Sequence, residues 1–90
     1  SRVLIGSGNH KGKGYCKDMV NEVLKIGFEE LKLHRISLGV YDFNSPALKC
    51  YQSTGFSIDG TMRDVLMYKE KWWSLIEMSI LEDEWKPNNG

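Results

Sequence analysis

The chain has 90 residues, enough for one small domain, and its 41% hydrophobic content is ordinary for a soluble globular protein. Its 12 basic and 12 acidic side chains balance, and the longest basic cluster, Lys11, Lys13 and Lys17, is too small for a nucleic-acid-binding surface. No apolar run approaches the roughly 18 residues that cross a bilayer, and the first residues lack the features of a signal peptide. We therefore expect a cytoplasmic protein with no membrane or nucleic-acid partner.

Two cysteines, Cys16 and Cys50, fall in two different expected helices. No further Cys or His lies at metal-ligand spacing from either of them. The sequence therefore predicts neither a disulfide framework nor a metal site, and we expect two reduced, semi-buried thiols.

The first half of the chain predicts a strand, a helix and a second strand. Residues 3–5 are a short apolar run that a Gly-Ser-Gly-Asn turn ends. Residues 15–31 repeat apolar side chains with the spacing of an amphipathic helix. Residues 35–41 alternate and place Ile36, Leu38 and Val40 on one face of a strand. Two strands joined by a helix within forty residues predict a parallel pair with a right-handed crossover.

The second half predicts a short helix and an antiparallel hairpin. Ser45 or Asn44 can cap a helix that begins at Pro46 and ends at Gly55. Residues 56–81 alternate as two strands, with the turn at Tyr-Lys-Glu-Lys, residues 68–71. The expected domain therefore covers residues 1–85, and residues 86–90 are expected to form a disordered tail.

Gly12 and Gly14 lie between lysines and open directly onto the expected helix at 15–31. A helix N-terminus carries unpaired N–H groups and a partial positive charge, and glycines let a phosphate approach the backbone. Glycine also serves such a turn for conformational reasons, so the loop alone leaves both readings open. The loop lacks the Ser or Thr of a P-loop, and Lys11 stands where a dinucleotide fingerprint needs its third glycine.

Four stretches together resemble the second half of the GNAT superfamily of acetyl-CoA-dependent N-acetyltransferases. They are NHKGKGYCKDMV, LHRISLGVYDFNSPALKCYQSTGF, GTMRD and WWSLIEMSILEDEW. The resemblance is to the branch that contains ribosomal-protein N-terminal acetyltransferases and spermidine acetyltransferases. In the family's loop signature, Gln or Arg precedes the two small residues by three and five positions. Here Asn9 departs from the first position, while Gly12 and Gly14 match.

This resemblance implies an α/β fold of the GNAT type. A mixed sheet has a parallel strand pair splayed around the cofactor, two helices flank it, and an antiparallel hairpin closes it. We expect the N-terminal half of the usual fold, which forms much of the acceptor pocket, to be absent. With the strand at 3–5 left at a sheet edge, we expect a homodimer.

The resemblance also implies roles for individual residues. Backbone N–H groups of the glycine loop bind the CoA pyrophosphate, and the first strand lines the pantetheine arm. The loop residues are Lys11, Gly12, Lys13, Gly14 and Tyr15, and the strand residues are Leu4, Ile5 and Gly6. Tyr51 matches the tyrosine that protonates the departing thiolate, and Asn44 matches the asparagine that contacts the cofactor. Both positions also suit purely structural roles, Tyr51 as a core aromatic and Asn44 as a helix cap.

No residue is a convincing general base. His34 lies at a helix-to-strand junction away from the parallel strands, and His10 suits a solvent-exposed loop. Asp42 and Glu77 are candidates by polarity alone, and Ser74 stands where family members often carry an acidic residue.

The expected function is transfer of an acetyl group from acetyl-CoA to a primary amine, either a small molecule or a protein N-terminus. One alternative is a truncated, weak or inactive CoA-binding remnant that dimerises. A third possibility is a binding module for another anionic ligand.

Overall fold

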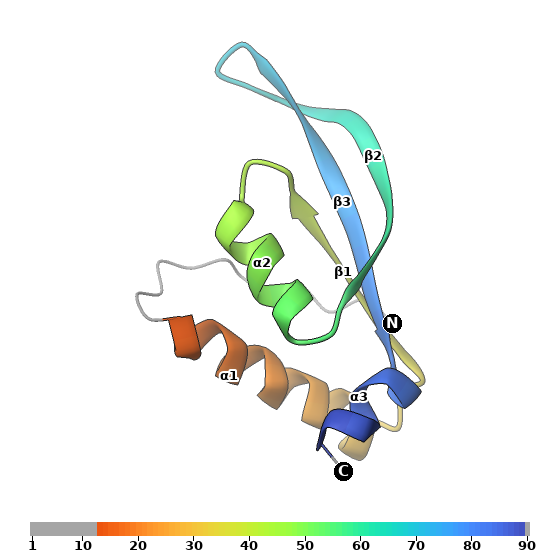
Figure 1. The fold of residues 1–90 in the computed structure, drawn as a ribbon. Helices are drawn as coiled ribbons and strands as arrows, with labels where there is room; N and C mark the ends of the chain where they lie inside the picture. The colour runs from red at the N-terminus through yellow and green to blue at the C-terminus, as the bar shows by residue number, and fades with distance from the viewer. Residues whose placement is uncertain (1–12, 90) are drawn as a thin grey trace.

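The structure is a computed structural model, and it describes residues 13–89. The elements in chain order are α1 (Lys13–Lys25), the π-helical turn η1 (Ile26–Glu30), β1 (Arg35–Tyr41), α2 (Ser45–Ser53), β2 (Ser57–Tyr68), β3 (Lys71–Leu81) and α3 (Glu82–Asn89) (Figure 1). Within this range, none of the helices combines the length and the apolar character needed to span a bilayer.

The three described strands form one antiparallel sheet in the order β1-β3-β2. The predicted strand at 3–5 lies outside the described residues, and so does the parallel pair that it would form with β1. β1 has the predicted bounds and pattern. Ile36 lies opposite Ile80 and Leu38 opposite Met78, so one face of the sheet is continuously apolar.

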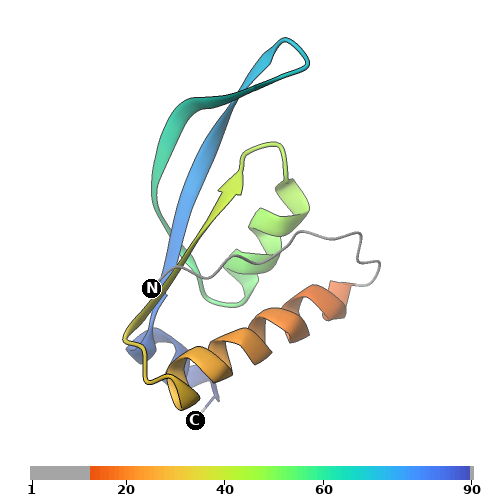
Figure 2. The same ribbon diagram turned by 180° about the vertical axis from the view of Figure 1, so that it is seen from behind.

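Helices α1 and α2 lie on the same side of this sheet (Figures 1 and 2). They supply apolar residues at helical spacing, which pack against the apolar sheet face. The buried helical residues are Val20, Leu24 and Phe28 from α1 and η1, and Ala47 and Tyr51 from α2. This arrangement confirms the predicted α/β architecture with two helices packed on the sheet.

Helix α2 has the predicted start and stop. The Asn44 side-chain oxygen accepts a hydrogen bond from the Ala47 N–H at 3.3 Å, so Asn44 and not Ser45 is the N-cap. Pro46 lies in the first turn. Gly55 ends the helix with a φ of +112°, a conformation that favours glycine.

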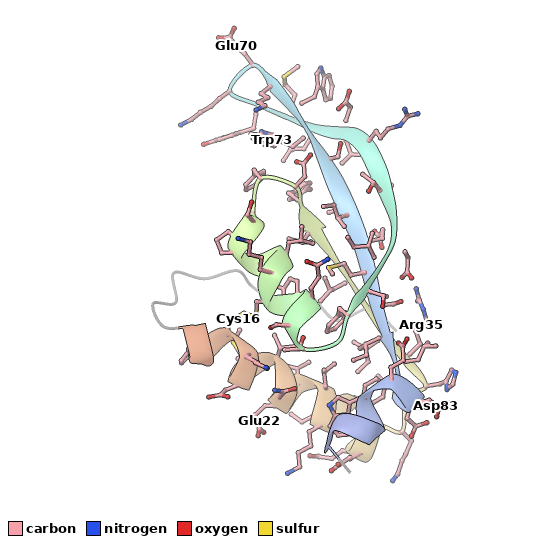
Figure 3. All side chains as sticks on the ribbon, in the orientation of Figure 1. Cys16, Glu22, Arg35, Glu70, Trp73 and Asp83 are labelled. Atoms are coloured by element: carbon pink, nitrogen blue, oxygen red, sulfur yellow. A yellow bond between two sulfur atoms is a disulfide. The ribbon has the colours of Figure 1, made fainter. Side chains whose placement is uncertain are left out.

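The β2–β3 hairpin is long and largely exposed. Its turn falls at the predicted residues, where Lys69 and Glu70 both have positive φ. Figure 3 shows Glu70 at the far tip of the hairpin and Trp73 nearer to α2. The Trp73 ring meets Phe43 edge-on with 4.8 Å between centroids, which ties the hairpin to the loop before α2.

Helix α3 was not predicted. The Glu84 carboxylate accepts a hydrogen bond from the Leu81 N–H at 2.9 Å, which is half of a capping box, and Trp85 is buried. The α3 backbone continues to Asn89, into residues expected to form a disordered tail. The acidic run Glu82-Asp83-Glu84 is the helix-start signal that the strand pattern before it obscured.

The prediction of two free thiols was wrong, because Cys16 and Cys50 form a disulfide with a Cα–Cα distance of 6.4 Å. The pairing follows from packing that sequence spacing does not reveal. Helices α1 and α2 cover the same sheet face, and this brings two residues 34 positions apart within disulfide range.

Candidate active site

The predicted anion site falls at the beginning of α1, where Lys13 is the first helical residue. The other predicted cofactor residues before it, Leu4, Ile5, Gly6, Lys11 and Gly12, lie outside the described residues. The first turn of α1 contains no acidic residue, and Tyr15 is 56% exposed. An anion that approaches this turn therefore meets the positive end of the helix with no opposing carboxylate from the turn itself.

Among residues 13–89, nothing requires Gly14 to be glycine, either for its backbone conformation or for its packing. A Cβ added there would find nothing within 4 Å, and the backbone does not adopt the positive φ that favours glycine. In a helix, glycine in place of alanine costs up to about 1 kcal/mol. A ligand that approaches the backbone closely is a physical reason for leaving this position without a side chain.

Tyr51 is held firmly near the end of α2. Its side chain is only 3% exposed and packs against Phe56, with ring centroids 5.9 Å apart. Its backbone carbonyl accepts hydrogen bonds from the Thr54 hydroxyl at 2.8 Å and from the Phe56 N–H at 3.0 Å. These hydrogen bonds fix the last turn of α2, while burial and the contact with Phe56 hold the Tyr51 ring.

Burial raises the pKa of the Tyr51 hydroxyl above its ordinary value near 10. Removing the phenol from water disfavours the charged phenolate, so the neutral form persists throughout the physiological pH range. A hydroxyl in this state has a proton to donate, which is the requirement for a general acid.

Asn44 and Tyr51 are seven residues apart, which is close to two turns of helix. This spacing puts them on roughly the same side of α2, about 10 Å apart along its axis. Asn44 is confirmed as the cap, and because its side-chain oxygen accepts the Ala47 N–H, its amide N–H₂ remains the group that could contact a ligand.

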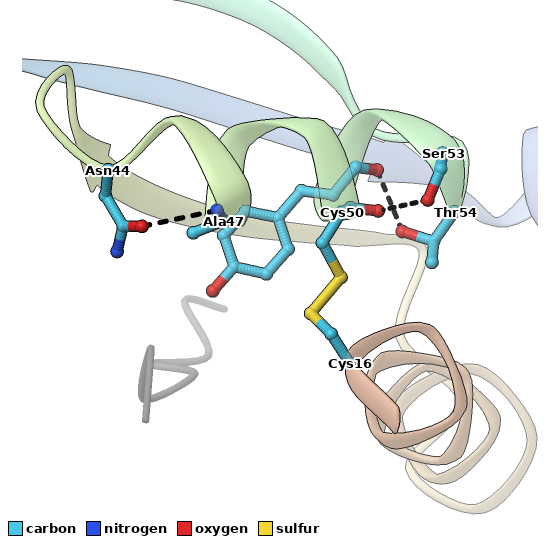
Figure 4. Close-up of a disulfide and its surroundings, with 7 residues drawn as sticks. Cys16, Asn44, Ala47, Cys50, Ser53 and Thr54 are labelled. Atoms are coloured by element: carbon cyan, nitrogen blue, oxygen red, sulfur yellow. Dashed lines mark hydrogen bonds between the residues drawn. A yellow bond between two sulfur atoms is a disulfide. The ribbon is translucent and has the colours of Figure 1, made fainter. Parts of the chain in front are cut away.

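The disulfide adds two residues that the sequence did not assign to the site. Cys16 lies in the fourth position of α1, two residues after Gly14, and Cys50 immediately precedes Tyr51. Figure 4 shows the bond joining the two helices beside Asn44, Ala47 and the last turn of α2. Only the even number of cysteines in the composition hinted at it.

A polar cluster surrounds Ser74 where β1 ends. The Ser74 N–H donates to the Asp42 carboxylate at 3.3 Å, the Asp42 N–H donates to the Ser74 carbonyl at 3.0 Å, and the Asp64 N–H donates to the Ser74 hydroxyl at 3.1 Å. Arg63, Asp64 and Ser74 line an open depression of about 540 Å³. Ser74 therefore organises the backbone geometry of this cluster.

The remaining base candidates are not brought together. His34 is exposed between η1 and β1, and its carbonyl accepts the Glu82 N–H at the end of the sheet next to α3. Glu77 lies on β3 opposite Gly39, on the sheet face away from the buried Ile36 row. Among residues 13–89, no group of three His, Cys, Asp or Glu side chains is placed to hold a metal ion.

The glycine loop and the elements that follow it match a known protein family. The sequence model of the family described as the acetyltransferase (GNAT) family matches residues 4–56, which is more than half of the chain. The chain belongs to the GNAT acetyltransferase family. The match includes the glycine loop, α1, β1 and α2, and so all the predicted cofactor and catalytic positions.

Two relatives and one solved structure illustrate the similarity. The SPbeta prophage-derived uncharacterized N-acetyltransferase YokL of Bacillus subtilis is 30% identical over 90% of this chain and 46% of its own length. Spermidine N(1)-acetyltransferase of Vibrio cholerae is 28% identical over 91% of this chain and 47% of its own. A crystal structure of mutant forms of the spermidine/spermine N-acetyltransferase SpeG from Vibrio cholerae superimposes with a TM-score of 0.82 at 25% identity. That superposition covers 99% of this chain and 55% of the other. The chain thus spans about half the length of the proteins it matches.

Proposed function

We propose that this chain binds acetyl-CoA and takes part in transferring its acetyl group to a primary amine. The observation that carries the proposal is Gly14, a helix-start glycine that nothing in its described surroundings requires, in a turn covalently linked to the helix of Tyr51. The names of the relatives support acetyl transfer. They do not favour the alternative of a catalytically weak or inactive remnant.

In this proposal the cofactor is held mainly by backbone groups. The N–H groups of Lys11, Gly12, Lys13, Gly14 and Tyr15 bind the pyrophosphate, because the start of a helix offers unpaired donors and a positive field. Leu4, Ile5 and Gly6 line the pantetheine arm, and Asn44 contacts the cofactor from the start of α2. Support comes from the family signature and from the open space beside Gly14.

The chemistry needs a neutral amine and a protonated leaving group. An amine of pKa about 10 is neutral only about one time in a thousand at pH 7, a penalty of roughly 4 kcal/mol. The amine nitrogen attacks the thioester carbonyl, the new amide bond forms, and the C–S bond breaks. Tyr51 donates its proton to the departing sulfur, and its raised pKa keeps that proton in place until then. The nitrogen releases one proton to solvent as the amide forms, and Tyr51 regains a proton from solvent.

We assign no general base to the attacking amine. Asp42 already accepts the Ser74 N–H, and His34 lies at the end of the sheet next to α3. The acceptor is a small-molecule amine or a protein N-terminus, and the spermidine acetyltransferases among the relatives make polyamines the first acceptors to test.

We further propose that the protein is a cytoplasmic homodimer. Within the described part of the sheet, β2 is an edge strand with no neighbour on its outer side. It also exposes the apolar side chains of Ile58, Met62, Val65 and Met67, which favours pairing with another copy. Analytical ultracentrifugation at micromolar concentration tests this, and a stable monomer would contradict it.

Calorimetric titration with acetyl-CoA tests the proposed ligand. We expect saturable binding, and much weaker binding of acetyl-pantetheine, which has the same thioester and arm but no pyrophosphate. Equal affinity for both ligands would show that the α1 turn does not hold the pyrophosphate. Absence of binding by a folded sample would refute the proposal, and binding would lead to a turnover screen over polyamines, amino acids and peptide N-termini.

A further inference from the structure

The disulfide between Cys16 and Cys50 joins the two helices that the proposed reaction depends on. Cys16 lies in the turn next to Gly14, and Cys50 is bonded through the backbone to Tyr51. Among residues 13–89 it is the only covalent cross-link. Its position therefore sets how far the start of α1 lies from the Tyr51 helix (Figure 4).

Helix α1 is anchored unevenly along its length. Its fully buried residues, Val20 and Leu24, come in the second half, and Phe28 follows in η1. In the first turn Gly14 and Tyr15 are exposed, and Cys16 is half-buried. Figures 1 and 2 show the N-terminal end of α1 lying away from the sheet, while its other end lies beside α3. Within residues 13–89, the packing that fixes α1 is thus concentrated at the end opposite the proposed anion site.

Helix α2 is anchored much more evenly. Ala47 and Tyr51 are both buried in the core, and the Asn44 side chain caps the N-terminal end of the helix. At the other end, the Thr54 hydroxyl and the Phe56 N–H donate hydrogen bonds to the Tyr51 carbonyl. If the disulfide opened, α2 would keep its place on the sheet. The start of α1 would lose its covalent link and gain freedom, as weakly packed helix ends do.

We propose that Cys16 and Cys50 form a redox-sensitive tether, which holds the first turn of α1 at a fixed distance from Tyr51 and whose reduction weakens acetyl-CoA binding. The second part of this inference rests on the proposed function. A cytoplasmic setting favours reversibility, because disulfides there are usually transient or redox-sensing. Both cysteines are half-buried and pack against the edge of the core rather than inside it.

The redox step balances with a dithiol as the reductant. One thiolate of the dithiol attacks a sulfur of the Cys16–Cys50 bond, forms a mixed disulfide and releases the other cysteine. The second thiol of the reductant then attacks the mixed disulfide and releases the cysteine that is held in it. The protein gains two electrons and two protons as two thiols, and the reductant leaves as its own disulfide.

The test compares the oxidised and the reduced chain by hydrogen exchange and by calorimetric titration with acetyl-CoA. Alkylation under denaturing conditions, with mass analysis, verifies the state of both cysteines. On reduction we expect faster amide exchange in the first turns of α1 and little change in α2. We expect acetyl-CoA affinity to fall by about 5-fold or more. Cys16→Ser and Cys50→Ser each remove the disulfide, so both variants should have the amide exchange and the acetyl-CoA affinity of the reduced chain. Added reductant should change neither quantity in these variants.

The other possible results contradict either the tether itself or its effect on acetyl-CoA binding. Free thiols in a chain kept under oxidising conditions, or unchanged exchange on reduction, would refute the tether. Faster exchange with equal acetyl-CoA affinity would refute the coupling to the cofactor. If neither form binds acetyl-CoA while reduction still speeds exchange in α1, the proposed function is wrong and the tether stands.

Discussion

Phe28 and Trp85 pack with ring centroids 5.4 Å apart, so the end of the α1–η1 segment and the C-terminal helix α3 share one aromatic contact. Both side chains are almost fully buried. The contact closes the apolar core at the end of the sheet away from the hairpin tip, and it gives α3 a reason to fold although its sequence is mostly polar.

Replacing Trp85 by alanine therefore tests whether α3 belongs to the core. We expect Trp85→Ala to lower the free energy of unfolding by about 3–5 kcal/mol, the usual cost of removing a buried large aromatic. Urea denaturation measures this. Trp72→Ala is the matched control, because Trp72 is 52% exposed and should change stability by about 0.5 kcal/mol or less. Equal effects of the two substitutions would show that α3 does not contribute to the core.

Gly27 of η1 lies against the side chain of Ile36 in β1. A Cβ there would overlap Cδ1 of Ile36. We expect Gly27→Ala to destabilise the fold by about 1–3 kcal/mol through overpacking, despite the better helix propensity of alanine. Ile36→Val removes the overlapping atom, so the double variant should be more stable than the two single effects predict. Strict additivity in urea denaturation would argue against this contact.

Replacing Gly14 by alanine should stabilise the fold and weaken acetyl-CoA binding. Gly14→Ala meets no steric conflict and improves helix propensity, so we expect the free energy of unfolding to rise by a few tenths to about 1 kcal/mol. The added methyl group lies where the proposed pyrophosphate approaches the backbone, so acetyl-CoA affinity should fall. Gly60→Ala is the control, because Gly60 is equally open but lies in β2. Unchanged affinity of Gly14→Ala would remove the ligand-based reason for this glycine.

Tyr51→Phe tests the proposed general acid. The substitution keeps the buried ring and its contact with Phe56 but removes the proton donor. We expect acetyl transfer to an amine acceptor to fall by about 10²–10⁴-fold in kcat, with acetyl-CoA affinity little changed. Tyr68→Phe, at an exposed position in β2, serves as the control. Turnover of Tyr51→Phe equal to the parent would leave Tyr51 a purely structural residue.

The raised pKa of Tyr51 also predicts how stability depends on pH. The folded chain holds the neutral hydroxyl more strongly than the unfolded chain, so above the unfolded pKa near 10 the unfolded state binds fewer protons. This contribution is fully present below about pH 10 and is lost as the pH rises through the higher folded pKa. Urea denaturation from about pH 8 to about pH 11 should therefore show a shallower decline for Tyr51→Phe. Identical slopes would mean that Tyr51 titrates alike in both states.

The sequence by itself determined the elements whose signals are local. Strict alternation set the bounds of β1, and Asn44, Pro46 and Gly55 marked the start and end of α2 because capping and backbone conformation depend on neighbours along the chain. The roles of the glycine loop and Tyr51 come from short family motifs in the sequence, and those roles stay predictions. The π-helical turn was not foreseen, because apolar spacing alone does not distinguish it from continued α-helix.

Only the tertiary structure decided what depends on packing between distant segments. Cys16 and Cys50 pair because α1 and α2 share one sheet face, and no spacing rule reveals that. Trp85 is buried against Phe28 from the first half of the chain, a contact that no local pattern around Trp85 reveals. The pKa of Tyr51 rises for the same reason, since the burial that raises it comes from neighbours brought together by the fold.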